Sequence, residues 1–94
     1  MRINGKSRLD EFMQKHADAR GPLKGWLAEV EKAQWHTSQD IKSMYPTASF
    51  RHENRVIFNI KGNSYRLVVK VTYPVKIVLI VWIGTHSEYQ KREF

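Results

Sequence analysis

A chain of 94 residues with 16 Lys and Arg against 9 Asp and Glu has a formal net charge of +7, which indicates a polyanionic or acidic partner. The absence of cysteine excludes disulfides and thiolate metal sites and fits a reducing compartment, so we expect a cytoplasmic protein. The sequence has no run of about 18 apolar residues that could span a membrane, and its 41% hydrophobic content suits one domain over residues 1–94.

The first part of the chain has the residue spacing of helices. Ser7 followed by Asp10 resembles a capping box and predicts that a helix begins there. Gly21-Pro22 interrupts this pattern, and because proline suits the first turn of a helix, we expect a second helix over residues 22–33. Its apolar positions recur on one helical face, at Leu23, Trp26, Leu27 and Val30.

A third helix and an edge strand are expected next. Thr37 with Asp40 repeats the capping-box pattern and predicts a short helix that ends before Pro46. The mixed segment after this proline predicts one edge strand around Ala48–Arg51.

Residues 54–72 predict a β-hairpin. Apolar and polar positions alternate there with the period of a strand, and Gly62-Asn63 has the composition of a two-residue turn. In this register Asn59 pairs with Arg66, and one face of the hairpin is apolar. The other face then carries Arg55, Asn59, Lys61, Arg66 and Lys70.

The same register places Arg55 directly opposite Lys70. Like charges at paired positions destabilise a sheet, so this pair suggests an anionic ligand on the polar face. The alternative is an ordinary solvated surface, on which long cationic side chains cover apolar neighbours.

The C-terminal part predicts a central strand followed by a short helix. Residues 75–84 are apolar on both faces, which favours a central position, and Thr85 with Glu88 forms a capping box. His86 lies in the first turn of this helix and is a candidate for proton transfer near neutral pH, with a surface or capping-region histidine as the alternative. The predicted fold is α+β, with N-terminal helices on one face of a small, mainly antiparallel sheet and a short C-terminal helix.

Neither a metal nor a cofactor is expected. The four histidines are far apart in the sequence and lack zinc-site spacing, and no glycine-rich phosphate loop is present. They are His16, His36, His52 and His86.

Two stretches resemble the HigB toxins of type II toxin–antitoxin modules: VIFNIKGNSYRLVV at residues 56–69 and IGTHSEY at residues 83–89. Upstream segments match as well, so the resemblance covers nearly the whole chain. It implies a RelE-like fold and an endoribonuclease that cleaves mRNA on the translating ribosome without a metal. It also implies neutralisation by a HigA-like helix-turn-helix antitoxin. The chain departs from the family at Gln90, where members usually carry an acidic residue.

RNA cleavage of this kind uses the neighbouring 2′-OH as the nucleophile, so the protein must orient the backbone, stabilise phosphate charge and move protons. We assign the phosphate to Arg66 and Lys61, proton transfer to His86 and a stacking or hydrogen-bonding role to Tyr89. These four are the predicted catalytic residues. The predicted RNA-binding residues are Arg55, Asn59, Asn63, Lys70 and Lys91.

Two other readings use the same basic face. The chain could be a non-catalytic module that binds RNA or the ribosome, or a degenerate toxin that has lost its activity. The sequence alone does not separate these readings from an active nuclease.

Overall fold

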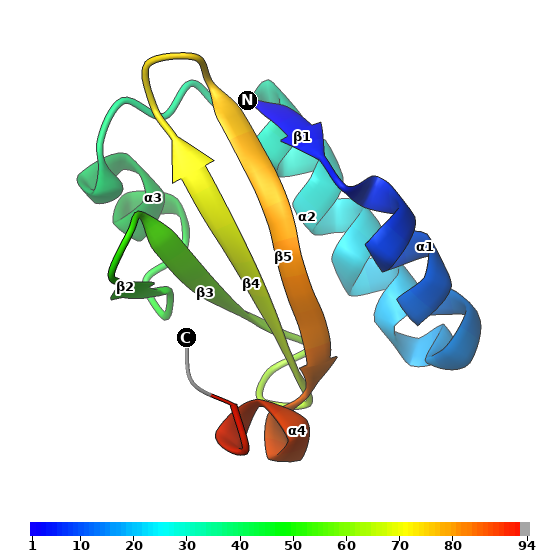
Figure 1. Ribbon diagram of the computed structural model, residues 1–94. Helices are drawn as coiled ribbons and strands as arrows, with labels where there is room; N and C mark the ends of the chain where they lie inside the picture. The colour runs from blue at the N-terminus through cyan, green and yellow to red at the C-terminus, as the bar shows by residue number, and fades with distance from the viewer. Residues whose placement is uncertain (93–94) are drawn as a thin grey trace.

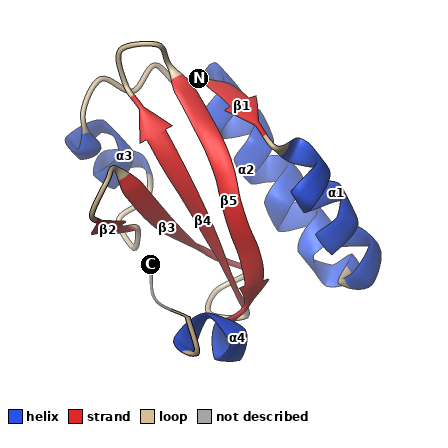
Figure 2. Ribbon diagram, viewed as in Figure 1, coloured by secondary structure: helices blue, strands red, loops and turns tan. Residues whose placement is uncertain are grey.

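The computed structural model describes residues 1–92 and shows an α+β protein, as the sequence predicts (Figure 1). Its sheet has five strands in the order β1-β5-β4-β3-β2 (Figure 2). Neighbouring strands are antiparallel except for β1, which pairs parallel with β5. The strands are β1 (Arg2–Asn4), β2 (Ser49–Arg51), β3 (Arg55–Ile60), β4 (Tyr65–Thr72) and β5 (Ile77–Thr85).

Helices cover one face of the sheet. Helix α1 (Lys6–Lys15) continues through the short 3-10 turn η1 (Ala17–Ala19) into α2 (Arg20–Lys32). Figure 1 shows these two helices beside each other near β1 and β5, with α3 (Ser38–Met44) toward β2 and β3. Helix α4 (His86–Gln90) directly follows β5. In residues 1–92 no helix is both long and apolar enough to cross a membrane.

The core lies between these helices and the sheet, and Phe58 is at its aromatic centre. The Phe58 ring centroid lies 5.3 Å from that of Trp26, 6.3 Å from that of Trp35 and 5.1 Å from that of Tyr45. We call the covered side of the sheet the helix face. Its buried strand residues include Val56, Phe58, Ile60, Leu67, Val69 and Ile80.

The start of α1 differs from the sequence prediction. The helix begins at Lys6, with Gly5 as its N-cap at φ 89°, so the predicted capping box at Ser7 and Asp10 is wrong. Strand β1, which the sequence did not predict, runs directly into this turn. A Cβ on Gly5 would lie 3.3 Å from Ile80, so glycine allows both the left-handed turn and the close approach to β5.

Two other helix starts are confirmed, because their signals are local. Asp40 accepts a hydrogen bond from the Thr37 N–H at 3.2 Å at the start of α3. Glu88 accepts one from the Thr85 N–H at 2.8 Å at the start of α4. Both pairs are complete capping boxes.

The predicted hairpin register is confirmed from the Arg55–Lys70 pair to the Ile60–Tyr65 pair. Lys61 is the exception. It lies beyond the ladder at φ 53°, and its carbonyl accepts the Ser64 N–H that closes the turn. Its ammonium group lies 2.7 Å from the Asp18 carboxylate in η1. The expectation that Lys61 shares a face with Arg66 is therefore wrong.

Asp18 joins the tip of this hairpin to the helical layer. Its carboxylate accepts hydrogen bonds from the Lys61 ammonium and from the Tyr65 hydroxyl, at 2.7 and 2.5 Å. These bonds, that from Lys61 foremost, hold the pKa of Asp18 below its ordinary value of 3.8.

We expect Asp18→Asn to make the free energy of unfolding less dependent on pH in the acid range. A carboxyl whose pKa is lowered by folding stabilises the protein above its unfolded pKa, and this contribution is lost as the pH falls through the folded pKa. The urea midpoint of the wild type should exceed that of the variant above about pH 5, and the difference should narrow toward about pH 3. A difference that stays constant over this range would contradict the role given to Asp18.

Candidate functional site

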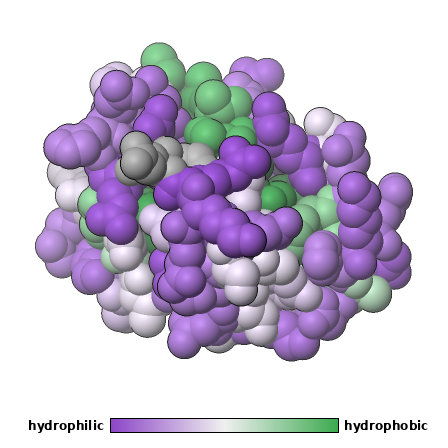
Figure 3. Space-filling model, turned by 60° about the horizontal axis from the view of Figure 1, so that its bottom comes forward, coloured by the Kyte–Doolittle hydropathy of each residue, from purple (hydrophilic) through white to green (hydrophobic). Residues whose placement is uncertain are grey.

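The face of the sheet opposite the helices is the candidate site. We call it the open face. Figure 3 shows that the end of the molecule that carries α4 has a predominantly hydrophilic surface. Strand pairing sets Asn59 opposite Arg66 and Arg66 opposite Gly84, so three strands meet in one row beside α4. The open face carries Arg55, Ile57, Asn59, Arg66, Val68, Lys70, Leu79, Trp82 and Gly84.

A β-bulge selects the β5 side chains of this face. The pairing of β4 with β5 shifts between Val68 and Val69, so that Val69 pairs with Ile80 but Val68 pairs with Trp82. Val81 is the extra residue. Trp82 and Gly84 consequently point to the open face.

Arg66 stacks on Tyr89. Its guanidinium carbon lies 4.9 Å from the centroid of the tyrosine ring, which α4 supplies. Within residues 1–92 the Nε atom of Arg66 is buried and has no hydrogen-bond partner. The ring thus holds the guanidinium plane in one orientation.

Trp82 and Arg92 form a second stack, which the sequence analysis missed. The Arg92 guanidinium carbon lies 5.4 Å from the Trp82 ring centroid, and the Trp82 and Tyr89 rings are 6.2 Å apart. A Cβ on Gly84 would overlap the Trp82 indole, so this position must be small. The available signals were the Trp82-x-Gly84 spacing, which puts both residues on one strand face, and the three-residue step from Tyr89 to Arg92.

His86 is the first residue of α4 and is half-buried. Its backbone N–H donates to the Ser64 carbonyl at 3.2 Å, which ties α4 to the β3–β4 turn. Tyr89 follows three residues later, and residues at this spacing lie on one side of a helix. His86 also lies two residues beyond Gly84, the partner of Arg66. The structure therefore brings His86, Arg66 and Tyr89 to the same end of the sheet.

Glu88 has a structural role. Its carboxylate accepts the Thr85 N–H, and its own N–H donates to the Thr85 hydroxyl at 3.1 Å. The first of these bonds lowers the pKa of Glu88 from its ordinary value of 4.5. The group is thus kept as a carboxylate that caps α4, as the sequence predicts.

The other predicted residues are more scattered. Arg55 and Lys70 pair at the far end of the hairpin, about 13 Å along β3 from Asn59. Glu53, 3.6 Å from Arg55, offsets the like charges, so the pair does not require an anionic ligand. Asn63 is exposed in the turn, and exposed Lys91 lines a groove with Trp82 and Arg92. No group of three metal-ligating side chains that could hold an ion occurs among the residues described.

The family assignment agrees with this fold. A family model described as HigB toxin, the RelE-like toxic component of a toxin–antitoxin system, matches residues 19–92. The chain therefore belongs to this toxin family, as the resemblance predicted, and a toxin of such a system has an antitoxin as its partner. No curated protein matched the chain.

Proposed function

We propose that this protein is an endoribonuclease that cleaves mRNA on the translating ribosome in the cytoplasm and is neutralised by a HigA-like helix-turn-helix antitoxin. The observation that carries the proposal is Arg66, whose guanidinium is stacked on Tyr89 and whose buried Nε has no partner among residues 1–92. Arginine is suited to bind phosphate through its planar fork of donors. The net charge of +7 would attract RNA to this site.

The reaction we propose needs no metal. The 2′-oxygen attacks the adjacent phosphorus, and the 5′-oxygen of the next nucleotide leaves. The products are a 2′,3′-cyclic phosphate and a 5′-hydroxyl, so one proton is removed from the nucleophile and one is given to the leaving group. Arg66 would stabilise the charge that develops on the phosphate oxygens.

His86 is our candidate for one of these proton transfers. It lies at the same end of the sheet as Arg66, and imidazole can take up and release protons near neutral pH. Asn59, paired with Arg66, would orient the nucleotide. Tyr89 and Trp82 would hold bases near the scissile phosphate by stacking, the usual way in which proteins bind unstacked RNA bases.

We expect Arg66→Ala to slow cleavage about 100-fold or more, because one donor to the transition-state charge is lost. Arg66→Lys should recover only part of the rate, since it keeps the charge but not the planar fork. The measurement is single-turnover cleavage of a message on translating ribosomes, read by primer extension. Lys24→Ala, which removes an exposed cation from α2, is the matched control and should cleave normally.

Two results would count against this proposal. A folded Arg66→Ala protein that cleaves at the wild-type rate would remove Arg66 from the site. A wild-type protein that binds translating ribosomes but leaves the message intact would favour the binding-only module.

We expect His86→Gln to slow cleavage by about 100- to 10,000-fold, the usual contribution of general acid–base catalysis. The pH dependence of the cleavage rate should change as well, because the variant lacks a group that exchanges protons. His52→Gln, at an exposed turn position remote in sequence, is the control and should keep the wild-type profile. An unchanged profile for His86→Gln would exclude His86 as the proton-transfer group.

A further inference from the structure

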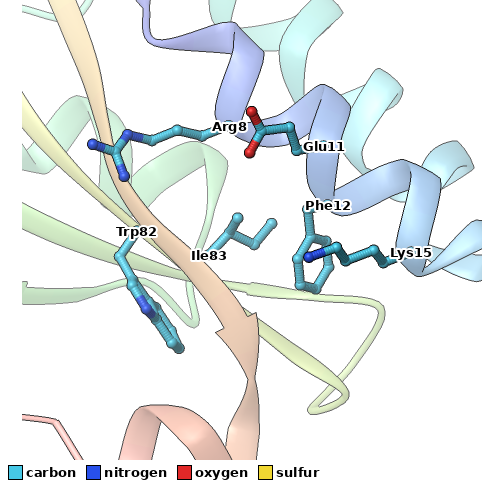
Figure 4. Close-up of a pocket in the computed structure, with 6 residues that line it drawn as sticks. All are labelled: Arg8, Glu11, Phe12, Lys15, Trp82 and Ile83. Atoms are coloured by element: carbon cyan, nitrogen blue, oxygen red, sulfur yellow. The ribbon is translucent and has the colours of Figure 1, made fainter.

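A groove lies between α1 and the outer edge of β5. Strand β1 pairs with β5 over Ile77–Leu79, and the following part of β5 runs alongside α1. Figure 4 shows the side chains of both elements that line the groove. They are Arg8, Glu11, Phe12 and Lys15 of α1 and Trp82 and Ile83 of β5.

Two cations of α1 face this groove. Arg8 and Lys15 are seven residues apart, about two helical turns, and so lie on the same side of the helix. Figure 4 shows the Arg8 side chain extended across β5 toward Trp82 and that of Lys15 directed into the groove beside Phe12. Neither cation belongs to an ion pair among the described residues. Glu11 lines the same groove, so its charged side chains carry a net charge of +1 above an apolar and aromatic floor.

The groove leads to the candidate site. A second hollow is lined by Trp82, Ile83, Glu88, Lys91 and Arg92, and it shares Trp82 and Ile83 with the first. Arg92 stacks on Trp82, and the Trp82 ring lies beside that of Tyr89, on which Arg66 stacks. The two hollows therefore adjoin at Trp82 and Ile83, and the ring contacts of Trp82 and Tyr89 connect them to Arg66; we call this sequence of hollows and rings the path.

We propose that this path binds single-stranded RNA, with Arg8 and Lys15 contacting phosphates of the segment that flanks the nucleotide at Arg66. The inference rests on the proposed function and adds a binding site to it. Cations spaced along a groove with aromatic and apolar walls are typical of sites for single strands, because both the backbone and the exposed bases find partners. A duplex keeps its bases stacked and cannot use the floor formed by Phe12, Trp82 and Ile83. Helix α1 lies outside the residues that the family model matches.

The test measures binding of fluorescent single-stranded RNA of about 4 and about 12 nucleotides as a function of salt. All proteins carry Arg66→Ala, so that cleavage does not consume the RNA. Combining Arg8→Gln with Lys15→Gln should reduce the slope of log K against log salt by about 1.4 on the longer RNA, or about 0.7 for each phosphate contact. The shorter RNA, held near α4, should show little change.

The matched control removes the same two charges from α2, by Lys24→Gln with Lys32→Gln, and should leave the slope close to that of the parent. Arg8→Lys with Lys15→Arg keeps both charges and should restore the slope. A duplex of about 12 base pairs is included as a substitute for ribosomal RNA helices. For this duplex the α1 pair and the control pair should change the salt slope of binding equally.

Equal slopes for the α1 pair and the control pair on the longer RNA would overturn the proposal. The proposal would also fail if the α1 pair reduced the slope on the short RNA or on the duplex as much as on the longer RNA. Failure of the parent protein to bind single strands would also overturn it. The proposed function is judged separately by cleavage with Arg66 restored. If the protein cleaves RNA but the slopes do not differ, only the proposed RNA-binding path is rejected. If the slopes differ but the protein does not cleave RNA, only the proposed nuclease activity is rejected.

Discussion

The register shift between β4 and β5 determines which side chains surround Arg66. If Val81 were paired in regular alternation, Val81 and Ile83 would point to the open face and Trp82 into the core. With Val81 as the extra residue, Trp82 covers Gly84, and the strand ends where Thr85 can cap α4. Helix α4 then presents Tyr89 to Arg66. The arginine and its aromatic partners are therefore a consequence of one irregular backbone position.

This arrangement leaves Arg66 incompletely satisfied. A buried donor without an acceptor costs about 1–3 kcal/mol, and native proteins retain few such groups. The stack on Tyr89 compensates in part, since a cation over an aromatic ring contributes about 0.5–2 kcal/mol depending on its exposure. The ring of Tyr89 thus fixes the guanidinium of Arg66 in the absence of any ligand.

Local patterns in the sequence were sufficient for much of the fold. The Gly62-Asn63 turn and the alternation around it set the hairpin register, and the capping boxes at Thr37 and Thr85 set two helix starts. What the sequence could not provide depends on distant partners. Strand β1 has three residues, too few for a visible period, and exists because it pairs with β5. Lys61 leaves the predicted face because Asp18, 43 residues away, binds its ammonium group.

Part of the geometry around Arg66 could also be predicted from the sequence, whereas the roles of its residues stay predictions. The pairing of Asn59 with Arg66 followed from the hairpin, and the closeness of Arg66 and Tyr89 agrees with the resemblance. The face of Trp82 could not be predicted because a bulge inside an apolar strand leaves no mark on composition, and its contact with Arg92 depends on that face. The groove lined by Arg8 and Lys15 was missed for another reason. Its two walls come from opposite ends of the chain.

The reaction that we propose for this site cleaves RNA through the neighbouring 2′-hydroxyl. The most direct measurement uses a message on translating ribosomes that carries a single 2′-deoxynucleotide immediately before the scissile phosphate. We predict that the all-ribose message is cut to 2′,3′-cyclic phosphate and 5′-hydroxyl ends, and that the substituted message stays intact at that position. Cleavage at the deoxynucleotide, or 3′-hydroxyl and 5′-phosphate ends on the all-ribose message, would contradict this prediction.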